Sequence, residues 1–360
     1  MDRYLVLENG MVFRGKGFGS DKEVTAEIVF TTAMTGYIET LTDPSYTGQA
    51  VVQTFPLIGN YGIIPEDAES RFVSPSAYIV RSYCEEPSNF RAEETLDNYL
   101  KAHDIPGLYD IDTRHLTRVL RENGTMNGRI TDDPDAVDQE ALKQYRAENP
   151  VRCVTVSEMD VRKAEHEKYR VALLDFGKKE NICRSLLKRD CTVYVLPAET
   201  DAGEILSLHP DGLFLSNGPG DPTENKTVIE TLKELLPHQI PTMGICLGHQ
   251  LLALAHGFTT EKLKYGHRGA NQPVRYSKNG RSYISSQNHG YAVVPESIDP
   301  QVAEPLFTNV NDNTNEGLLY HNLPAFSVQF HPEACGGPRD TDFLFDDFIS
   351  LIDRRTFLCH

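Results

Sequence analysis

The sequence predicts an α/β protein made of two domains, and three features lead to that prediction. In residues 169–360, short apolar runs alternate with helical patterns, which is typical of a doubly wound, mostly parallel sheet with helices on both faces. In residues 1–150, short strand patterns and turn signals predominate and predict an α+β domain rich in strands. Residues 151–168 are polar with little periodicity and are predicted to be a linker.

The overall composition fits a globular protein. The chain has 360 residues, which is long enough for two cores, and its 35 basic and 52 acidic residues give a net charge of −17. Because such a surface repels phosphate backbones and anionic headgroups, neither nucleic acid nor a membrane is an expected partner. No apolar run reaches the roughly 20 residues that span a bilayer, and the first residues lack the layout of a signal peptide. We therefore expect a cytoplasmic protein.

The cysteines support the same compartment. The seven cysteines are scattered and none forms a CxxC pair. This pattern favours reduced thiols over a disulfide framework and argues against a structural zinc site.

The elements of the first domain follow from short local signals. Apolar runs on both sides of Asn9-Gly10, in YLVLENGMVFRG, predict a hairpin. Further strands are predicted in EIVFTTAMTGY, AVVQTFPLI and YIVRSY. Helical patterns occur in FRAEETLDNYLKAHD and DIDTRHLTRVLRENG; in the second, Asp112 is placed to cap the helix and Gly124 to end it.

The second domain begins with four apolar runs. They are YRVALLDFG, CTVYVLP, DGLFLSNGPG and IPTMGIC, with helical patterns between them. Ligand sites in parallel sheets form at the carboxyl ends of the strands, where three of these runs end in loops. A hairpin is predicted at Asn279-Gly280, a strand in AFSVQF, and a final helix with Leu344, Phe348, Leu351 and Ile352 on one face.

The stretch GICLG, residues 244–248, predicts a nucleophile. It follows an apolar run, precedes the helix-forming LGHQLLALA and has the Gly-x-Cys-x-Gly spacing of a nucleophile elbow. Such a turn holds Cys246 in a strained conformation near a helix N-terminus, where the dipole favours a thiolate. The N–H of Leu247 would stabilise an oxyanion at the same place. A buried, unreactive core thiol is the alternative.

A thiolate nucleophile needs a base, and His331 in QFHPEA is the candidate. It ends a strand pattern, so we expect it at the sheet edge where the elbow lies. Glu333 follows two residues later, on the same side of an extended chain, and would orient the imidazole. The alternative is that His-Pro-Glu forms a surface turn. We take His249, His267 and His289 as structural.

The loop SNGPGDP follows a strand and is rich in glycine. Its backbone could approach a ligand closely, and its N–H groups could complete an oxyanion hole. An ordinary strand-ending turn is the alternative. The sequence contains neither a GxxxxGK[ST] phosphate loop nor a GxGxxG pattern, so nothing in it predicts an ATP or dinucleotide site.

Four motifs in this order resemble those of the class I (triad) glutamine amidotransferases: LSNGPGDP, GICLGHQ, QNHG and HPEA. Four further stretches are similar to the small chain of carbamoyl phosphate synthetase: MTGYIETLTDPSYTGQ, NYGI, DIDTRHLTRVLRENG and NQPV. The resemblance covers nearly the whole chain, and other amidotransferases of the class lack the first domain.

The resemblance implies that glutamine is hydrolysed to glutamate and ammonia through a glutamyl thioester. The ammonia would pass to a separate large chain, the other half of a heterodimer, which makes carbamoyl phosphate for arginine and pyrimidine synthesis. The resemblance implies no cofactor in this chain; ATP, magnesium and bicarbonate would bind the large chain.

The resemblance also assigns roles to particular residues. Cys246 falls on the nucleophile, His331 on the base and Glu333 on the orienting acid, and Gly218 and Leu247 would supply the oxyanion N–H donors. The glutamine contacts that it implies are Ser45, Gly218, Gly220, Leu247, Gln250, Asn288, Gly290 and Tyr291.

Two positions depart from the family pattern. Tyr291 stands where the family commonly has Phe, and residues 335–338 read Cys-Gly-Gly-Pro where it has Ser-Pro-Gly-Pro. One hypothesis is that Cys335 makes the site sensitive to oxidation; a solvent-facing thiol without consequence is the simpler expectation. Two other functions remain open: an amidotransferase that serves another acceptor, such as an anthranilate- or GMP-type synthase, and a non-catalytic subunit that kept the fold.

Overall fold

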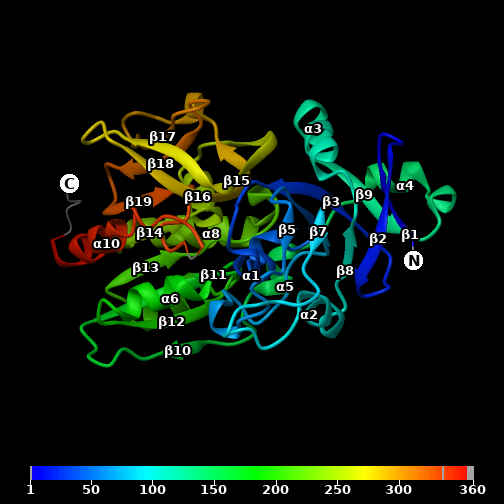
Figure 1. Cartoon of the computed structure of the whole chain (residues 1–360). Coiled ribbons are helices and arrows are strands. Elements are labelled where there is room, and N and C mark those ends of the chain that lie inside the picture. The colour runs from blue at the N-terminus through cyan, green and yellow to red at the C-terminus, as the bar shows by residue number, and fades with distance from the viewer. Residues whose placement is uncertain (1, 335, 355–360) are drawn as a thin grey trace. The chain divides into compact units, whose positions relative to one another are not determined.

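The computed structural model describes residues 2–334 and 336–354 (Figure 1). The chain divides into two compact units, Met1–Pro150 and Val151–His360. Each unit has buried hydrophobic clusters of its own. Within the described residues, no helix is long and apolar enough to cross a membrane.

The first unit contains a closed β-barrel. Within the described residues its strands follow the order β1-β2-β8-β6-β4-β3-β9. They are β1 (Asp2–Leu7), β2 (Val12–Gly19), β3 (Val24–Thr31), β4 (Gln49–Gln53), β6 (Ala77–Ile79), β8 (Pro106–Tyr109) and β9 (Met126–Thr131). The antiparallel pair β1 and β2 confirms the hairpin at Asn9-Gly10, where Gly10 has a φ of 85°.

Short helices lie between and after the barrel strands along the chain. They are α1 (Tyr37–Leu41), α2 (Leu96–Ala102), α3 (Thr113–Asn123) and α4 (Gln139–Gln144). The caps predicted for α3 are confirmed: the Asp112 side chain accepts a hydrogen bond from the N–H of His115, and Gly124 ends the helix with a φ of 98°. Leu116 and Leu120 of α3 are fully buried and pack into the same cluster as the strands.

Predicted elements of the first unit differ from the structure in several places. EIVFTTAMTGY is a strand only as far as Thr31, and AVVQTFPLI forms two strands, β4 and β5 (Leu57–Ile58), in place of one. The run YIVRSY forms two strands, β6 and β7 (Ser82–Tyr83), and β7 pairs with β5 in a separate small sheet. The helix predicted in FRAEETLDNYLKAHD is only α2. It begins late because Thr95 caps it, accepting a hydrogen bond from the N–H of Asn98.

The second unit is built on one large mixed sheet with the order β10-β12-β11-β13-β14-β19-β18-β17-β15-β16. Its parallel part consists of β11 (Tyr169–Asp175), β12 (Cys191–Pro197), β13 (Gly212–Leu215), β14 (Thr242–Ile245) and β19 (Ala325–Val328). The antiparallel strands are β10 (Asp160–Arg162), β15 (Thr260–Tyr276), β16 (Ser282–Val293), β17 (Ala303–Asn309) and β18 (Asn315–Tyr320). The hairpin of β15 and β16 turns at the predicted Asn279-Gly280.

Helices cover both faces of this sheet. Along β11, Ala172 and Leu174 belong to one buried cluster, and Val171 and Leu173 to the other. The first cluster includes residues of α7 (Ala202–Ser207), α8 (Lys226–Leu235) and α9 (Leu247–Ala255); the second includes residues of α6 (Glu180–Leu187) and α10 (Phe343–Arg354). The predicted α/β class is thus confirmed, and α10, red in Figure 1, is the predicted final helix.

Residues 151–168, predicted to be a linker, carry structure that belongs to the second unit. The helix α5 (Pro150–Val154) begins the segment, and β10 pairs with β12 at one edge of the sheet. Val151 is buried, and the N–H of Val156 donates to Oδ2 of Asp175 at 3.0 Å. The segment has no apolar run because an edge strand is covered on fewer sides than a central one. Without an apolar run, the sequence pattern did not predict a strand there.

Candidate active site

Cys246 lies at a sharp strand-to-helix turn. β14 ends at Ile245 and α9 begins at Leu247, and between them Cys246 has a φ of 53° and a ψ of −104°. L-residues rarely adopt this conformation. Non-glycine residues stay in such conformations only where surrounding contacts hold them there, and such positions cluster at active sites. The backbone at GICLG therefore has the form of the predicted elbow.

Three glycines allow the backbone segments around this turn to pack closely. A Cβ atom on Gly244 would lie 2.8 Å from the carbonyl oxygen of Gly248, and one on Gly248 would lie 2.3 Å from that of Leu215. A Cβ on Gly218, in the loop after β13, would lie 2.3 Å from the carbonyl oxygen of Phe176. Because these neighbours are backbone atoms, they cannot move aside as a side chain would, so the close approach requires glycine.

Cys246 is buried and hydrogen-bonded to two strands. Its N–H donates to the carbonyl oxygen of Val328 at 2.8 Å, and its thiol donates to that of Asn288 at 3.7 Å. Two other buried cysteines, Cys183 and Cys191, lie in environments that make their thiols unreactive. Burial raises the pKa of each of their thiols to about 12, which disfavours the reactive thiolate.

His331 is oriented by Glu333. Nδ1 of the imidazole lies 2.7 Å from Oε1 of Glu333, and the backbone N–H of His331 donates to the carbonyl oxygen of Ser286 at 2.9 Å. Because a carboxylate only accepts hydrogen bonds, Nδ1 carries the proton and Nε2 is the basic nitrogen of the neutral ring. Among the described residues, Nε2 has no hydrogen-bond partner. The strand predicted in AFSVQF ends earlier than expected, at Val328 of β19, and His331 and Glu333 lie in the segment that follows it.

Glu333 also contacts Lys179, a residue for which the sequence predicted no role. Its Nζ lies 3.3 Å from Oε1 of Glu333. Burial acts to raise the pKa of Glu333, but its interactions with His331 and Lys179 outweigh it and lower this pKa to about 2. The carboxylate is therefore ionised near neutral pH. One signal was available: Lys179 lies just after the carboxyl end of β11, where sites form in parallel sheets.

The motif QNHGY lies on β16, which carries three of the predicted glutamine contacts: Asn288, Gly290 and Tyr291. The carbonyl oxygen of Tyr291 accepts a hydrogen bond from Nε2 of Gln250 at 2.8 Å. The same Nε2 donates to Oε1 of Gln329 at 2.9 Å. Gln250, in α9, thus connects the helix after the elbow to β16 and to the segment that leads to His331.

The remaining predicted residues are placed as follows. Ser45 belongs to the first unit, in the turn η1 (Pro44–Tyr46), where its N–H donates to Oδ1 of Asp43 at 3.0 Å. Gly220 lies in the loop after β13 with a φ of 91°. Cys335 lies outside the described residues.

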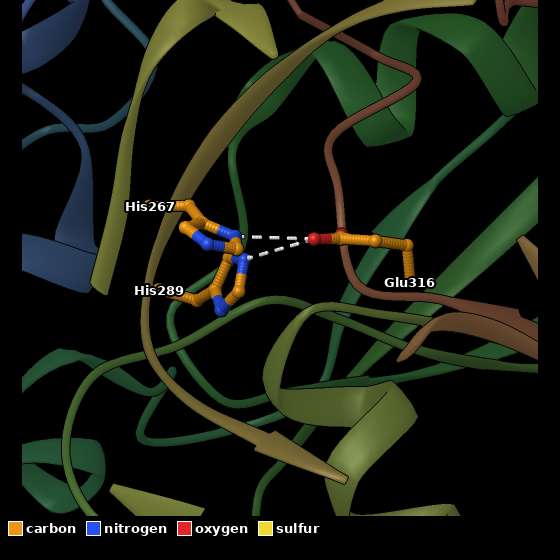
Figure 2. A group of neighbouring side chains, drawn as sticks. All are labelled: His267, His289 and Glu316. Atoms are coloured by element: carbon orange, nitrogen blue, oxygen red, sulfur yellow. Dashed lines mark hydrogen bonds and ion pairs between the residues drawn. The ribbon is translucent and has the colours of Figure 1, made fainter. Parts of the chain in front are cut away.

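The other histidines near the motifs are buried. His249 contacts Oγ of Ser327 through Nδ1 at 2.8 Å, and burial lowers its pKa to about 3, which fits the structural role predicted for it. His267 on β15, His289 on β16 and Glu316 on β18 lie together in a cluster (Figure 2). In the described part of the chain, this cluster has the side chains that could hold a metal ion.

The sequence matches two protein families. Residues 5–130 match the family described as carbamoyl-phosphate synthase small chain, CPSase domain, and residues 172–351 match glutamine amidotransferase class-I. The second match, together with the helix-covered sheet, defines the second unit as a class I glutamine amidotransferase domain.

Curated relatives match along almost the full chain. The carbamoyl phosphate synthase small chain of Bacillus thuringiensis subsp. konkukian (strain 97-27) is 51% identical over 354 residues, which cover 98% of this chain and 96% of that protein. That of Oceanobacillus iheyensis is 51% identical over 355 residues, 97% of this chain and 96% of that protein. A relative from Halalkalibacterium halodurans, named carbamoyl phosphate synthase pyrimidine-specific small chain, is 49% identical over 356 residues, 98% of each chain.

These matches establish the family. The chain belongs to the carbamoyl phosphate synthase small chains. With its glutamine amidotransferase domain, it is a glutamine-hydrolysing synthase subunit, as the sequence predicted. An amidotransferase of the anthranilate or GMP type is not supported, because the first domain matches the carbamoyl phosphate synthase family.

Proposed function

We propose that Cys246 attacks the side-chain amide of glutamine and that the chain passes the released ammonia to a large synthetase chain. The observation that carries this proposal is the strained Cys246 at a strand-to-helix turn, together with the hydrogen-bonded pair of His331 and Glu333. Cys246 and His331 both hydrogen-bond to β16, through Asn288 and Ser286, which lie two residues apart. This common anchor supports a joint role for the thiol and the imidazole.

The chemistry that follows is acyl transfer to sulfur. Nε2 of His331 accepts the thiol proton of Cys246, and the sulfur adds to the amide carbon of glutamine. The imidazolium returns the proton to the leaving nitrogen as the C–N bond breaks, which yields ammonia and a glutamyl thioester. Water, deprotonated by the same nitrogen, then cleaves the thioester to glutamate and the free thiol. Glu333 holds the imidazole in the required tautomer throughout, and Lys179 keeps Glu333 ionised.

The negative oxygen that forms at the amide carbon needs donors. We assign this role to the backbone N–H groups of Leu247, at the start of α9, and of Gly218. The tight approach of the Gly218 loop to Phe176 supports a fixed position for that N–H.

The remaining glutamine contacts rest on the family resemblance. They are Ser45, Gly220, Gln250, Asn288, Gly290 and Tyr291, and Ser45 lies in the first unit. The backbone of Asn288 and Tyr291 already contacts Cys246 and Gln250, which supports a place for β16 beside the substrate.

The partner and its cofactors are part of the same proposal. The family of small chains implies a large chain, on which we place ATP, magnesium and bicarbonate, with no cofactor in this chain. The product, carbamoyl phosphate, would serve pyrimidine and arginine synthesis in the cytoplasm; one relative is named pyrimidine-specific.

A glutaminase assay tests this proposal. The complex with its large chain should release ammonia from glutamine, and Cys246→Ser should lower the rate by at least about 10³-fold, because an alcohol is a far weaker nucleophile here than a thiolate. Trapping with acid should recover a glutamyl group on Cys246 in the wild type only. Equal rates for the two proteins would instead support a non-catalytic subunit that kept the fold.

A further inference from the structure

A buried ion cluster lies beside the strand that carries the site. His267 on β15 contacts Glu316 on β18 at 3.1 Å from Nδ1 to Oε1, and Asp312 at 2.7 Å from Nε2 to Oδ2. The carboxylate of Glu316 also accepts a hydrogen bond from Nδ2 of Asn309 at 3.2 Å. In Figure 2, His267 and His289 both turn toward the same oxygen of Glu316. Glu316 is fully buried, so its charge requires a partner inside the protein.

His267 supplies that partner through Nδ1. Both of its ring nitrogens lie within hydrogen-bond distance of a carboxyl oxygen, one on Glu316 and one on Asp312, so the ring is held from both sides. Burial acts to lower the pKa of His267, but the hydrogen bonds and charges of Glu316 and Asp312 outweigh it and raise this pKa. Burial also raises the pKa of Glu316, so the two groups are joined by a hydrogen bond in either protonation state.

The cluster links β18 to β16, two strands that are not neighbours in the sheet. In the sheet, β17 and β15 lie between β18 and β16. His289 on β16 is paired with His267, and its Nε2 lies 3.8 Å from Oε1 of Glu316. The regular ladder here is short: the register shifts on one side between Lys262 and His267 and on the other between Gly269 and Gln272. Only three ladder pairs lie between these shifts, so side-chain contacts add to the backbone in holding this part of β16.

The same part of β16 holds the site. Asn288 accepts from the thiol of Cys246, Tyr291 accepts from Gln250, and Ser286 accepts from the backbone of His331. We propose that His267, clamped between Glu316 and Asp312, is a positioning residue that fixes residues 286–291 of β16 for glutamine binding. It acts through the backbone of β16 and through His289, and it is not a catalytic residue. This inference rests on the proposed glutaminase function.

Steady-state kinetics of the complex with its large chain test the inference. Glu316→Ala removes the group that holds Nδ1 of His267, so we expect the KM for glutamine to rise at least about tenfold while kcat changes far less. Glu316→Gln keeps an oxygen that accepts from Nδ1 and should recover most of the affinity. Asp312→Asn, at a more exposed position, should raise KM in the same direction by a smaller factor.

A matched control separates positioning from general loss of packing. His256 packs against Tyr320, also on β18, with ring centroids 4.5 Å apart, and contacts no residue of the cluster in the described structure. His256→Ala should leave KM unchanged. Unchanged KM in both Glu316→Ala and Asp312→Asn would overturn the inference.

Metal analysis provides a second way to overturn it. One equivalent of zinc in the purified wild type, lost in Glu316→Ala, would make the cluster a metal centre rather than a hydrogen-bonded clamp. A wild-type complex that releases no ammonia from glutamine would instead refute the proposed function itself.

Discussion

At the scale of single residues, the backbone of Cys246 stores strain that the surrounding structure must hold. Its φ of 53° is imposed by contacts on both sides: its own N–H is bound to Val328, and the N–H of Gly248 donates to Ser216 at 3.0 Å. A nucleophile elbow is useful because it exposes the reactive atom at the start of a helix, and its cost is conformational. The conformation of Cys246 therefore lowers the stability of the fold while it exposes the sulfur for reaction.

Replacing Cys246 by glycine and by alanine separates the two effects. Glycine accepts a positive φ at little cost, whereas alanine must keep the strained conformation. We expect Cys246→Gly to unfold with a free energy about 1–3 kcal/mol above that of Cys246→Ala, measured by urea denaturation. Neither variant should hydrolyse glutamine.

The control for this comparison is Cys183, which is buried in the helix α6. There the order should reverse, because glycine in a helix is about 1 kcal/mol less favourable than alanine. If glycine is the less stable replacement at both positions, the turn at Cys246 is not strained.

Residue types and spacing pointed to Cys246, His331 and Glu333, and the structure brings the last two into contact. Their catalytic roles stay a prediction until the kinetics are measured. Lys179 and Glu316 could not be predicted in the same way. Each is an ordinary charged residue in sequence, and its partner is more than 45 residues distant, so only the order of the strands brings them together.

At the scale of elements, the signals that worked are those that act locally. The hairpins at Asn9-Gly10 and Asn279-Gly280 and the caps of α3 depend on a few neighbouring residues. The signals that failed depend on distant contacts. The two halves of YIVRSY pair with different strands, and β10 is a strand only because β12 offers it an edge.

The packing of α9 on β13 gives a test at this scale. Gly248→Ala places a Cβ atom 2.3 Å from the carbonyl oxygen of Leu215, so the helix and strand must separate. We expect a loss of about 1–3 kcal/mol in the free energy of unfolding, together with a fall in glutaminase activity as the elbow shifts.

The control is a second helical glycine that is exposed. Gly203 lies in α7, where a new Cβ would meet only the side-chain Oδ1 of Asp201 at 3.3 Å. Gly203→Ala should change the unfolding free energy by less than about 1 kcal/mol and leave activity intact. Equal losses at the two glycines would contradict a role for close packing at the elbow.

At the scale of the whole molecule, the two units have separate cores. The clusters of the first unit are formed by residues up to Ile130, and those of the second by residues from Val151 onward, within the described residues. A unit with its own core is expected to fold alone. The sequence predicted that the first domain ends at residue 150, the last residue of the first unit, and it assigned residues 151–168 to a linker, whereas they are part of the second unit.

Two fragments of different length test where the second unit begins. Fragment 151–360 keeps Val151 in its core, Val156 on Asp175, and β10 on β12. Fragment 169–360 starts at the predicted domain boundary and loses all three, which leaves the buried carboxylate of Asp175 without the Val156 N–H and exposes one edge of β12. Because losing a hydrogen bond to a buried charged group costs about 1.5–3 kcal/mol, we expect the longer fragment to unfold cooperatively in urea and the shorter one to be less stable by at least that amount. Equal unfolding midpoints for the two fragments would show that residues 151–168 do not stabilise the second unit and act as a linker.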